Sequence, residues 1–144
     1  MNDNDMADVM AALARLQSGD VEARLELMDL WTSAPQASAT RRCTLAHFLA
    51  DTETNPAAEL RWDRIALEAA TGDASGDADA VTQPLAAFLP SLHLNVGDAL
   101  RRVGDPELAR FHAQAGLGRA RNLPADGYGE AVRAALERLL ARVS

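Results

Sequence analysis

The chain has 144 residues, a formal net charge of −7 and a hydrophobic fraction of 48%, which together favour one globular domain over a disordered chain. Only 4% of the residues are aromatic, and good helix formers dominate, so a β-rich fold is not expected. No apolar run predicts a membrane span, the acidic N-terminus lacks the features of a secretory signal, and the single Cys43 suits a reducing cytoplasm.

Helical periodicity divides the chain into three hairpins and a final helix, separated by turn residues. The hairpins are expected at about residues 6–32, 37–70 and 83–121, the final helix at about 128–143, and a flexible loop at 71–82. Asn55-Pro56 and Asp105-Pro106 each combine an N-cap with a proline at the first helical position, which is a strong helix-start signal. The first helix of the third hairpin is expected from about Gln83 to Val103, with Pro90 as its one potential break.

The second and third hairpins share a sequence pattern. Leu45-Ala46-x-x-Leu49 recurs as Val96-Gly97-x-x-Leu100, and Asn55-Pro56 recurs as Asp105-Pro106. The third hairpin, with Gly97, Leu100, Gly104 and Ala109 at the characteristic spacing, resembles a tetratricopeptide repeat. By that resemblance the small Gly97 and Ala109 let the two helices approach closely, and Gly104 supports the tight turn between them. The resemblance implies an all-α domain of antiparallel hairpins stacked as a short right-handed superhelix with a C-terminal capping helix. The aromatic residue near the start of the repeat is replaced by His93, and an irregular helical bundle remains the alternative fold.

The resemblance also implies a binding groove, because the first helices of such hairpins line a concave surface that holds a peptide. By that resemblance the partner-binding residues are Thr44, His47 and Asp51 of the second hairpin and Leu94, Asn95, Asp98, Arg101 and Arg102 of the third. Asn95 is suitable because its amide both donates and accepts hydrogen bonds. Arg101 and Arg102 have a second interpretation, as cations that stabilise the C-terminal end of their helix.

The leading hypothesis is therefore a non-enzymatic adaptor without a cofactor. Its partner would be another protein, a peptide or a second copy of itself. The protein would act in the cytoplasm and would not bind a membrane. A small α-helical enzyme using His47, Asp51 and His93 is the alternative. Binding of nucleic acid through the C-terminal arginines is third, because the net charge of −7 disfavours a polyanion.

Three other constellations predict no specific chemistry. His47 and Asp51 lie one helical turn apart and could bind a metal ion together with His93 or His112, but no second close ligand pair supports a metal site, so surface or groove histidines are expected instead. The alternating acids from Asp73 to Asp79 resemble a calcium loop, but Ala78 and Pro84 replace its essential glycine and glutamate. Cys43 lies one turn from His47 without an orienting third group, so we expect a buried, inert thiol.

Overall fold

A computed structural model describes residues 6–33, 38–72, 83–121 and 123–144. Its elements are α1 (Ala7–Gln17), α2 (Ala23–Ser33), α3 (Ala39–Asp51), α4 (Pro56–Thr71), the 3-10 helix η1 (Gln83–Phe88), α5 (Leu89–Arg102), α6 (Pro106–Ala120) and α7 (Gly127–Val143). Because these described segments contain helices and no strand, the predicted all-α class is confirmed. None of these helices is long and apolar enough to cross a membrane.

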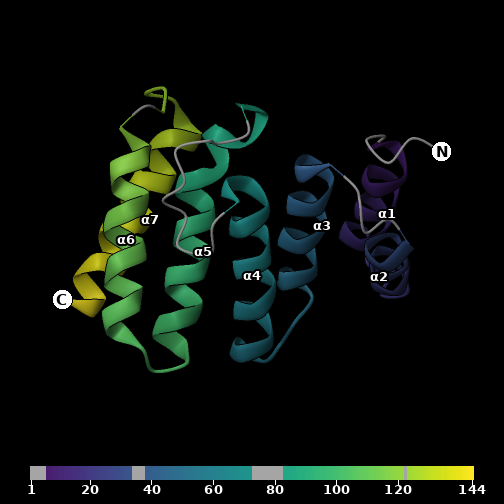
Figure 1. The fold of residues 1–144 in the computed structure, drawn as a ribbon, viewed down its shortest axis with the longest axis horizontal. Helices are drawn as coiled ribbons and strands as arrows, with labels where there is room; N and C mark the ends of the chain where they lie inside the picture. The colour runs from purple at the N-terminus through teal and green to yellow at the C-terminus, as the bar shows by residue number, and fades with distance from the viewer. Residues whose placement is uncertain (1–5, 34–37, 73–82, 122) are drawn as a thin grey trace.

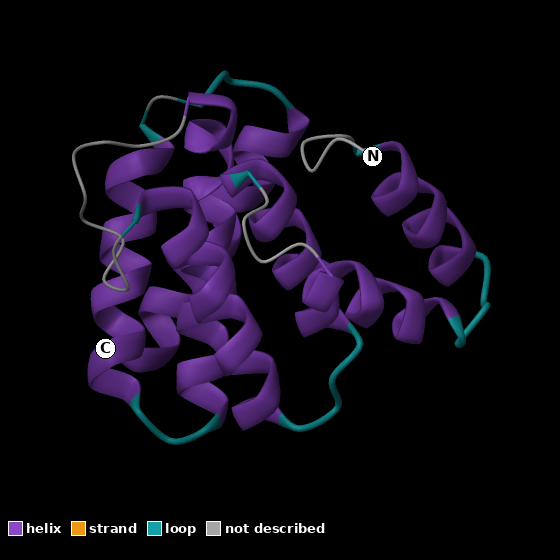
Figure 2. Cartoon of the chain, turned by 45° about the vertical axis from the view of Figure 1, so that its right-hand side comes forward, coloured by secondary structure: helices purple, strands orange, loops and turns teal. Residues whose placement is uncertain are grey.

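The helices stand in a row, with α1 and α2 at one end and α6 and α7 at the other (Figure 1). The pairs α1–α2, α3–α4 and α5–α6 pack as neighbours in sequence, and α2 then contacts α3 while α4 contacts α5. Helix α7 packs against both α5 and α6, as expected of a capping helix. Figure 2 shows the same row from a second direction. The right-handed superhelix implied by the resemblance remains a prediction.

Three helix starts follow the predicted capping chemistry. The side chains of Asn55, Asp105 and Asp126 each accept a hydrogen bond from a backbone N–H in the first turn of α4, α6 or α7, at 2.8–3.2 Å. Pro56 and Pro106 occupy the first turn, where a missing N–H costs nothing. The starts of α4 and α6 were predicted correctly from the sequence.

The start of α5 differs from the prediction of one helix beginning near Gln83. Residues 83–88 form a 3-10 helix, and α5 begins at Leu89, with Pro90 in its first turn. The physical reason is that proline lacks an N–H and is tolerated only at a helix start. Pro90 therefore begins α5 instead of interrupting it.

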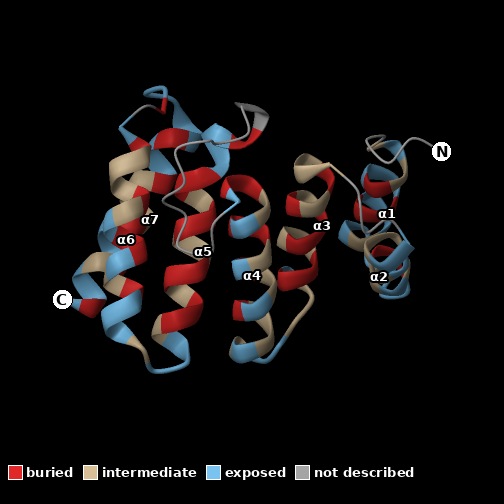
Figure 3. Cartoon of the chain, in the orientation of Figure 1, coloured by how far each residue is buried: buried red, intermediate tan, exposed pale blue. Residues whose placement is uncertain are grey.

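Each helix from α1 to α7 carries buried residues (Figure 3). One cluster joins α1, α2 and α3, a larger one joins α3 to α7, and a third lies between α6 and α7. Trp31 and Trp62 pack edge to face, with ring centroids 5.3 Å apart, and both contact the first and the second cluster. Cys43 is buried as predicted, and burial raises the pKa of its thiol to about 11.

Two glycines let the helices of the C-terminal half approach closely. A Cβ atom at Gly97 would lie 2.8 Å from Cδ2 of Leu139 and 3.4 Å from the carbonyl oxygen of Ala109. A Cβ atom at Gly116 would lie 2.7 Å from Leu136. The predicted close contact between Gly97 and Ala109 is confirmed, and α7 is the additional neighbour. Gly104 has a φ of +92°, which fits the tight turn that the sequence predicts.

Candidate binding groove

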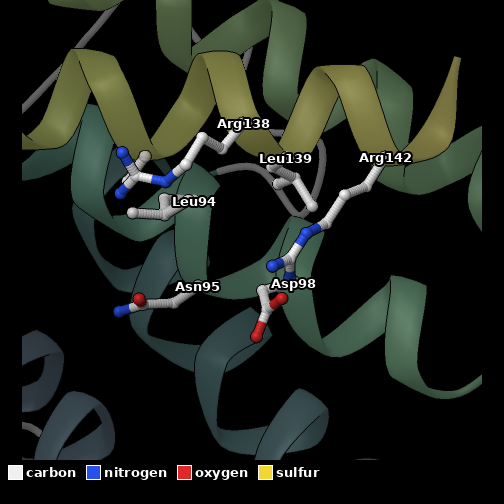
Figure 4. A pocket seen from close by; sticks show the side chains of 7 residues that line it. Leu94, Asn95, Asp98, Arg138, Leu139 and Arg142 are labelled. Atoms are coloured by element: carbon white, nitrogen blue, oxygen red, sulfur yellow. The ribbon is translucent and has the colours of Figure 1, made fainter.

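A pocket of about 280 Å³ lies between α5 and α7. We call it the α5–α7 pocket; its lining residues are Leu94, Asn95, Asp98, Ala135, Arg138, Leu139 and Arg142. Helix α7 places Leu139 against Gly97, and Arg138, Leu139 and Arg142 together line the α7 side of the pocket. Figure 4 shows Arg138 extending over Leu94 and Arg142 extending toward Asp98.

The rim of the α5–α7 pocket carries more positive charge than its contacts neutralise. Arg138 and Arg142 are exposed, and neither forms an ion pair with any residue in the described part of the chain. Asp98, the acid of the opposite wall, already accepts hydrogen bonds from Arg101 and Arg102 at 3.0–3.2 Å. The two arginines of α7 are therefore available to an anionic group entering from solvent.

Asn95 links this pocket to α3. Its Nδ2 donates to Nδ1 of His47 at 3.3 Å, across 48 residues of sequence. Its Oδ1 has no hydrogen-bond partner among the described residues. The side chain is half-buried and lines the pocket, and its hydrogen bond to His47 helps to set its position. This arrangement suits a donor such as a peptide N–H.

The sequence-predicted residues divide into four groups, of which Arg101 and Arg102 form the last. Leu94, Asn95 and Asp98 line the α5–α7 pocket. His47 reaches the same region through Asn95, and Asp51 lies at the end of α3. Thr44 donates to the carbonyl oxygen of Thr40 and is not part of the pocket lining.

Arg101 and Arg102 differ from the groove-facing placement expected of them. Both bind Asp98, and Arg102 also donates to Glu59 of α4 at 2.7 Å. The Glu59 and Asp98 carboxylates raise the pKa of Arg102, since they stabilise its charged form. These two arginines therefore tie the C-terminal end of α5 to its surroundings and do not line the pocket.

Arg138 and Arg142, which line the pocket, are not among the residues predicted from the sequence. They flank Leu139, which is buried on the core-facing side of α7. Residues one before and three after a core position lie at the edge of the buried face. The sequence therefore places both arginines at the edge of the buried face of α7, but it does not show which neighbouring helix that edge faces.

A buried acid lies where α3, α4 and α5 meet. Asp63 of α4 is only 4% exposed, and its Oδ2 has no hydrogen-bond partner. Burial, followed by the nearby negative charges of Glu59 and Asp51, raises the pKa of Asp63 to about 7. Arg102 opposes this shift without a hydrogen bond to Asp63. Asp63 is therefore partly protonated near neutral pH.

Asp51 belongs to the same electrostatic group. Partial loss of hydration raises its pKa, His47 opposes that shift, and the Glu59 carboxylate adds to it. The expectation that His47 and Asp51 face the same side of α3 agrees with this coupling. Acids from three helices thus converge near Asn95 and Asp98.

His93 and His112 do not belong to this group, and the expectation that they are surface or groove histidines is wrong. Both are buried, and their Nδ1 atoms lie 3.0 Å apart between α5 and α6. Burial, with smaller contributions from His112 and Arg119, lowers the pKa of His93 to about 4. The structure therefore does not bring His93 together with His47 and Asp51, the three residues of the alternative enzymatic hypothesis.

A second pocket of about 280 Å³ lies on α2, α3 and α4, with Trp31 and Arg42 in its lining. The guanidinium of Arg42 stacks over the Trp31 ring at 4.5 Å, so its charge already has an aromatic partner. Within the described ranges, no group of three or more His, Cys, Asp or Glu side chains is placed to hold a metal ion. The calcium-like segment from Asp73 to Asp79 lies outside these ranges.

Comparisons with family models, curated proteins and solved structures gave no match.

Proposed function

We propose that this chain is a protein-interaction module that binds an acidic peptide segment of a partner protein in the α5–α7 pocket. The observation that supports it is the pair of exposed arginines, Arg138 and Arg142, that have no ion-pair partner among the described residues. A guanidinium binds a carboxylate with directed, charge-assisted hydrogen bonds. Asn95 would fix the peptide backbone while the arginines hold its carboxylates.

The proposed binding mode resembles that of a tetratricopeptide-repeat adaptor, in which a groove along the first helices holds an extended segment. Here α5 supplies one wall and the capping helix α7 supplies the other. A groove of this kind needs no bound cofactor, and the partner is expected in the cytoplasm. Self-association remains a special case, in which the acidic segment comes from the N-terminal half of a second copy.

The first prediction concerns the two arginines. The probe is a fluorescein-labelled peptide, Gly-Ser-Gly-Asp-Gly-Ser-Asp, with a free C-terminal carboxylate. Replacing Arg138 and Arg142 together by alanine should weaken its binding by about tenfold or more, because two charge-assisted interactions are lost. Fluorescence anisotropy at roughly physiological salt measures the dissociation constant.

The matched control removes the same charge elsewhere. Arg61 and Arg64 are exposed on α4, line neither pocket and form no ion pair with the described residues. Their double alanine variant should bind the probe as the original chain does. Equal weakening by both double variants would show general charge attraction, and the proposed function would be wrong. A peptide with Asn in place of Asp and an amidated C-terminus should not bind.

A further inference from the structure

The acids that converge beside the α5–α7 pocket form a second feature, which we call the acidic notch: Asp51, Glu59, Asp63 and Asp98. They come from α3, α4, α4 and α5. Their negative charges act on one another, since Asp51, Glu59 and Asp98 all raise the pKa of Asp63. Glu59 and Asp63 lie one helical turn apart on α4, and Arg102 bridges Glu59 and Asp98 with hydrogen bonds of 2.7 and 3.0 Å.

The protein neutralises only part of the charge of the acidic notch, because Arg101 and Arg102 pair with Asp98 and Glu59 and no arginine pairs with Asp51 or Asp63 among the described residues. Arg102 donates to Glu59 Oε1 and Asp98 Oδ2, which leaves Asp63 without a hydrogen-bond donor for its Oδ2. Asp51 has no ion pair among the described residues. A carboxylate that is 96% buried and lacks a donor is costly unless a cation compensates it.

Helix packing does not require an acid at position 63. Asn55-Pro56 and Asp105-Pro106 begin α4 and α6 in the same way, so Asp63 corresponds to Ala113 of α6. Ala113 is fully buried and fills the equivalent place with a methyl group. The acid in α4 thus lowers stability relative to an apolar residue, which points to a binding role instead of a packing role.

The acidic notch is continuous with the α5–α7 pocket. Asp98 belongs to both, and Asn95 lines the pocket while its amide reaches His47, which interacts electrostatically with Asp51. One extended ligand can therefore contact Arg138 and Arg142 at one end and the acidic notch at the other. The two ends carry opposite charge.

We propose that the acidic notch receives the cationic side chain of an arginine or lysine in the same peptide whose carboxylates bind Arg138 and Arg142. This inference rests on the proposed function and adds the second half of the recognition pattern. The cation would contact the rim formed by Asp51 and the free Oε2 of Glu59, with Asp63 beneath it. As it binds, Asp63 becomes ionised and releases its proton to solvent, so the charge of the buried carboxylate is compensated.

The release of this proton makes binding depend on pH. Asp63 faces Glu59 on its own helix, Asp51 on α3, and Asp98 and Arg102 on α5, while His47 acts near Asp51. Only the ionised form of Asp63 attracts the cation fully. Between about pH 6 and about pH 8 the ionised fraction rises about tenfold, so affinity for the cationic group should rise by up to the same factor.

The experiment compares the acidic probe above with versions that carry one arginine at increasing distance N-terminal to the first Asp. At one or more spacings, the arginine should tighten binding by about tenfold at about pH 8, and by less at about pH 6. Asp63→Asn should abolish the arginine-dependent gain and most of its pH dependence. Asp51→Asn, at the exposed rim, should reduce the gain in affinity that the arginine gives. Because Asp51 is exposed, this substitution does not bury an unpaired polar group.

Glu107→Gln is the matched control, because Glu107 is exposed on α6 and has no ion-pair partner among the described residues. It should keep both the gain and the pH dependence, and circular dichroism confirms that each variant is folded. If no spacing tightens binding, or if Asp63→Asn behaves like the original chain, the acidic notch is not a cation site. Binding of the acidic probe itself reports separately on the proposed function.

Discussion

At the scale of single residues, Gly97 shows how tightly α5, α6 and α7 are packed. Its missing Cβ would come within 2.8 Å of a Leu139 methyl group, which belongs to a flexible side chain, and within 3.4 Å of the Ala109 backbone. Leu139 also lines the α5–α7 pocket. The absence of a side chain at position 97 therefore shapes both the core and the pocket.

Substitutions at Gly97 should separate helix propensity from packing. Gly97→Ala should be neutral to mildly destabilising, because the helix propensity gained offsets the displacement of Leu139. Gly97→Leu should cost roughly 1–3 kcal/mol, since a large side chain would force the helices apart. Chemical denaturation measures the free energy of unfolding of each variant.

Gly118 provides the matched control for Gly97. A Cβ there would meet only the end of the Arg121 side chain, at 3.8 Å. Gly118→Ala should therefore stabilise α6 by up to about 1 kcal/mol. Stabilisation by Gly97→Leu would contradict the close packing of Leu139 against Gly97, and with it the position of Leu139 in the pocket lining.

Trp62 joins two parts of the core. Its ring packs against Trp31 at a centroid distance of 5.3 Å, and its Nε1 donates to Glu53 at 3.3 Å. Although it is only half-buried, it contacts both the N-terminal cluster and the central cluster. Trp62→Ala should lower the free energy of unfolding by about 3 kcal/mol.

The conservative variant Trp62→Phe keeps a ring but loses the hydrogen bond to Glu53. It should cost about 1 kcal/mol, measured in the same denaturation experiment. A loss below about 1 kcal/mol for Trp62→Ala would instead indicate a surface residue with little role in the core. Trp62 would then be a candidate for an interaction surface.

At the scale of elements, helix starts were predictable because their chemistry is local. Asn55, Asp105 and Asp126 satisfy first-turn N–H groups within three residues of themselves, so the sequence contains both partners. The start of α5 was mispredicted because six residues before Pro90 form a 3-10 helix, which has almost the same periodicity as an α-helix.

The candidate site was only partly predictable, because its residues come from helices that lie far apart in the sequence. Leu94, Asn95 and Asp98 were found because the resemblance assigns one face of α5 to the groove. Arg138 and Arg142 were missed because their role depends on how α7 crosses α5, and that crossing is set by contacts such as Leu139 on Gly97. The burial of Asp63 likewise depends on how the helices pack against one another, and the sequence around Asp63 does not reveal it.

At the scale of the whole molecule, two buried groups oppose each other as the pH changes. His93 has a folded-state pKa of about 4, below its ordinary value of 6.5, so the unfolded chain binds more protons between these values. Its contribution to stability is lost as the pH falls through this window. Asp63 has a folded-state pKa of about 7, above its ordinary value of 3.8, so the folded chain binds the extra proton. Its contribution is gained as the pH falls.

The two effects are similar in size. Each corresponds to about 3–4 kcal/mol over its full window, because one pKa unit is about 1.4 kcal/mol. Between about pH 4.5 and about pH 6.5 the two windows overlap, and the slopes should nearly cancel. Above about pH 7, only the ionisation of Asp63 still affects the free energy of unfolding, and it lowers this free energy. The original chain should therefore show a broad plateau of stability on the acidic side of neutrality.

Removing either group should uncover the other. Asp63→Asn should raise the free energy of unfolding at about pH 8 by up to about 4 kcal/mol, since a buried charge is replaced by a neutral amide of the same shape. Between about pH 6.5 and about pH 4.5 the same variant should lose stability steadily, because the protonation of His93 in the unfolded chain is no longer offset. His93→Gln should show the opposite slope and gain stability on acidification. Urea denaturation across this pH range tests both; parallel curves for all three proteins would mean that neither group titrates as its burial requires, and the cation proposed for the acidic notch would then have no buried charge to compensate.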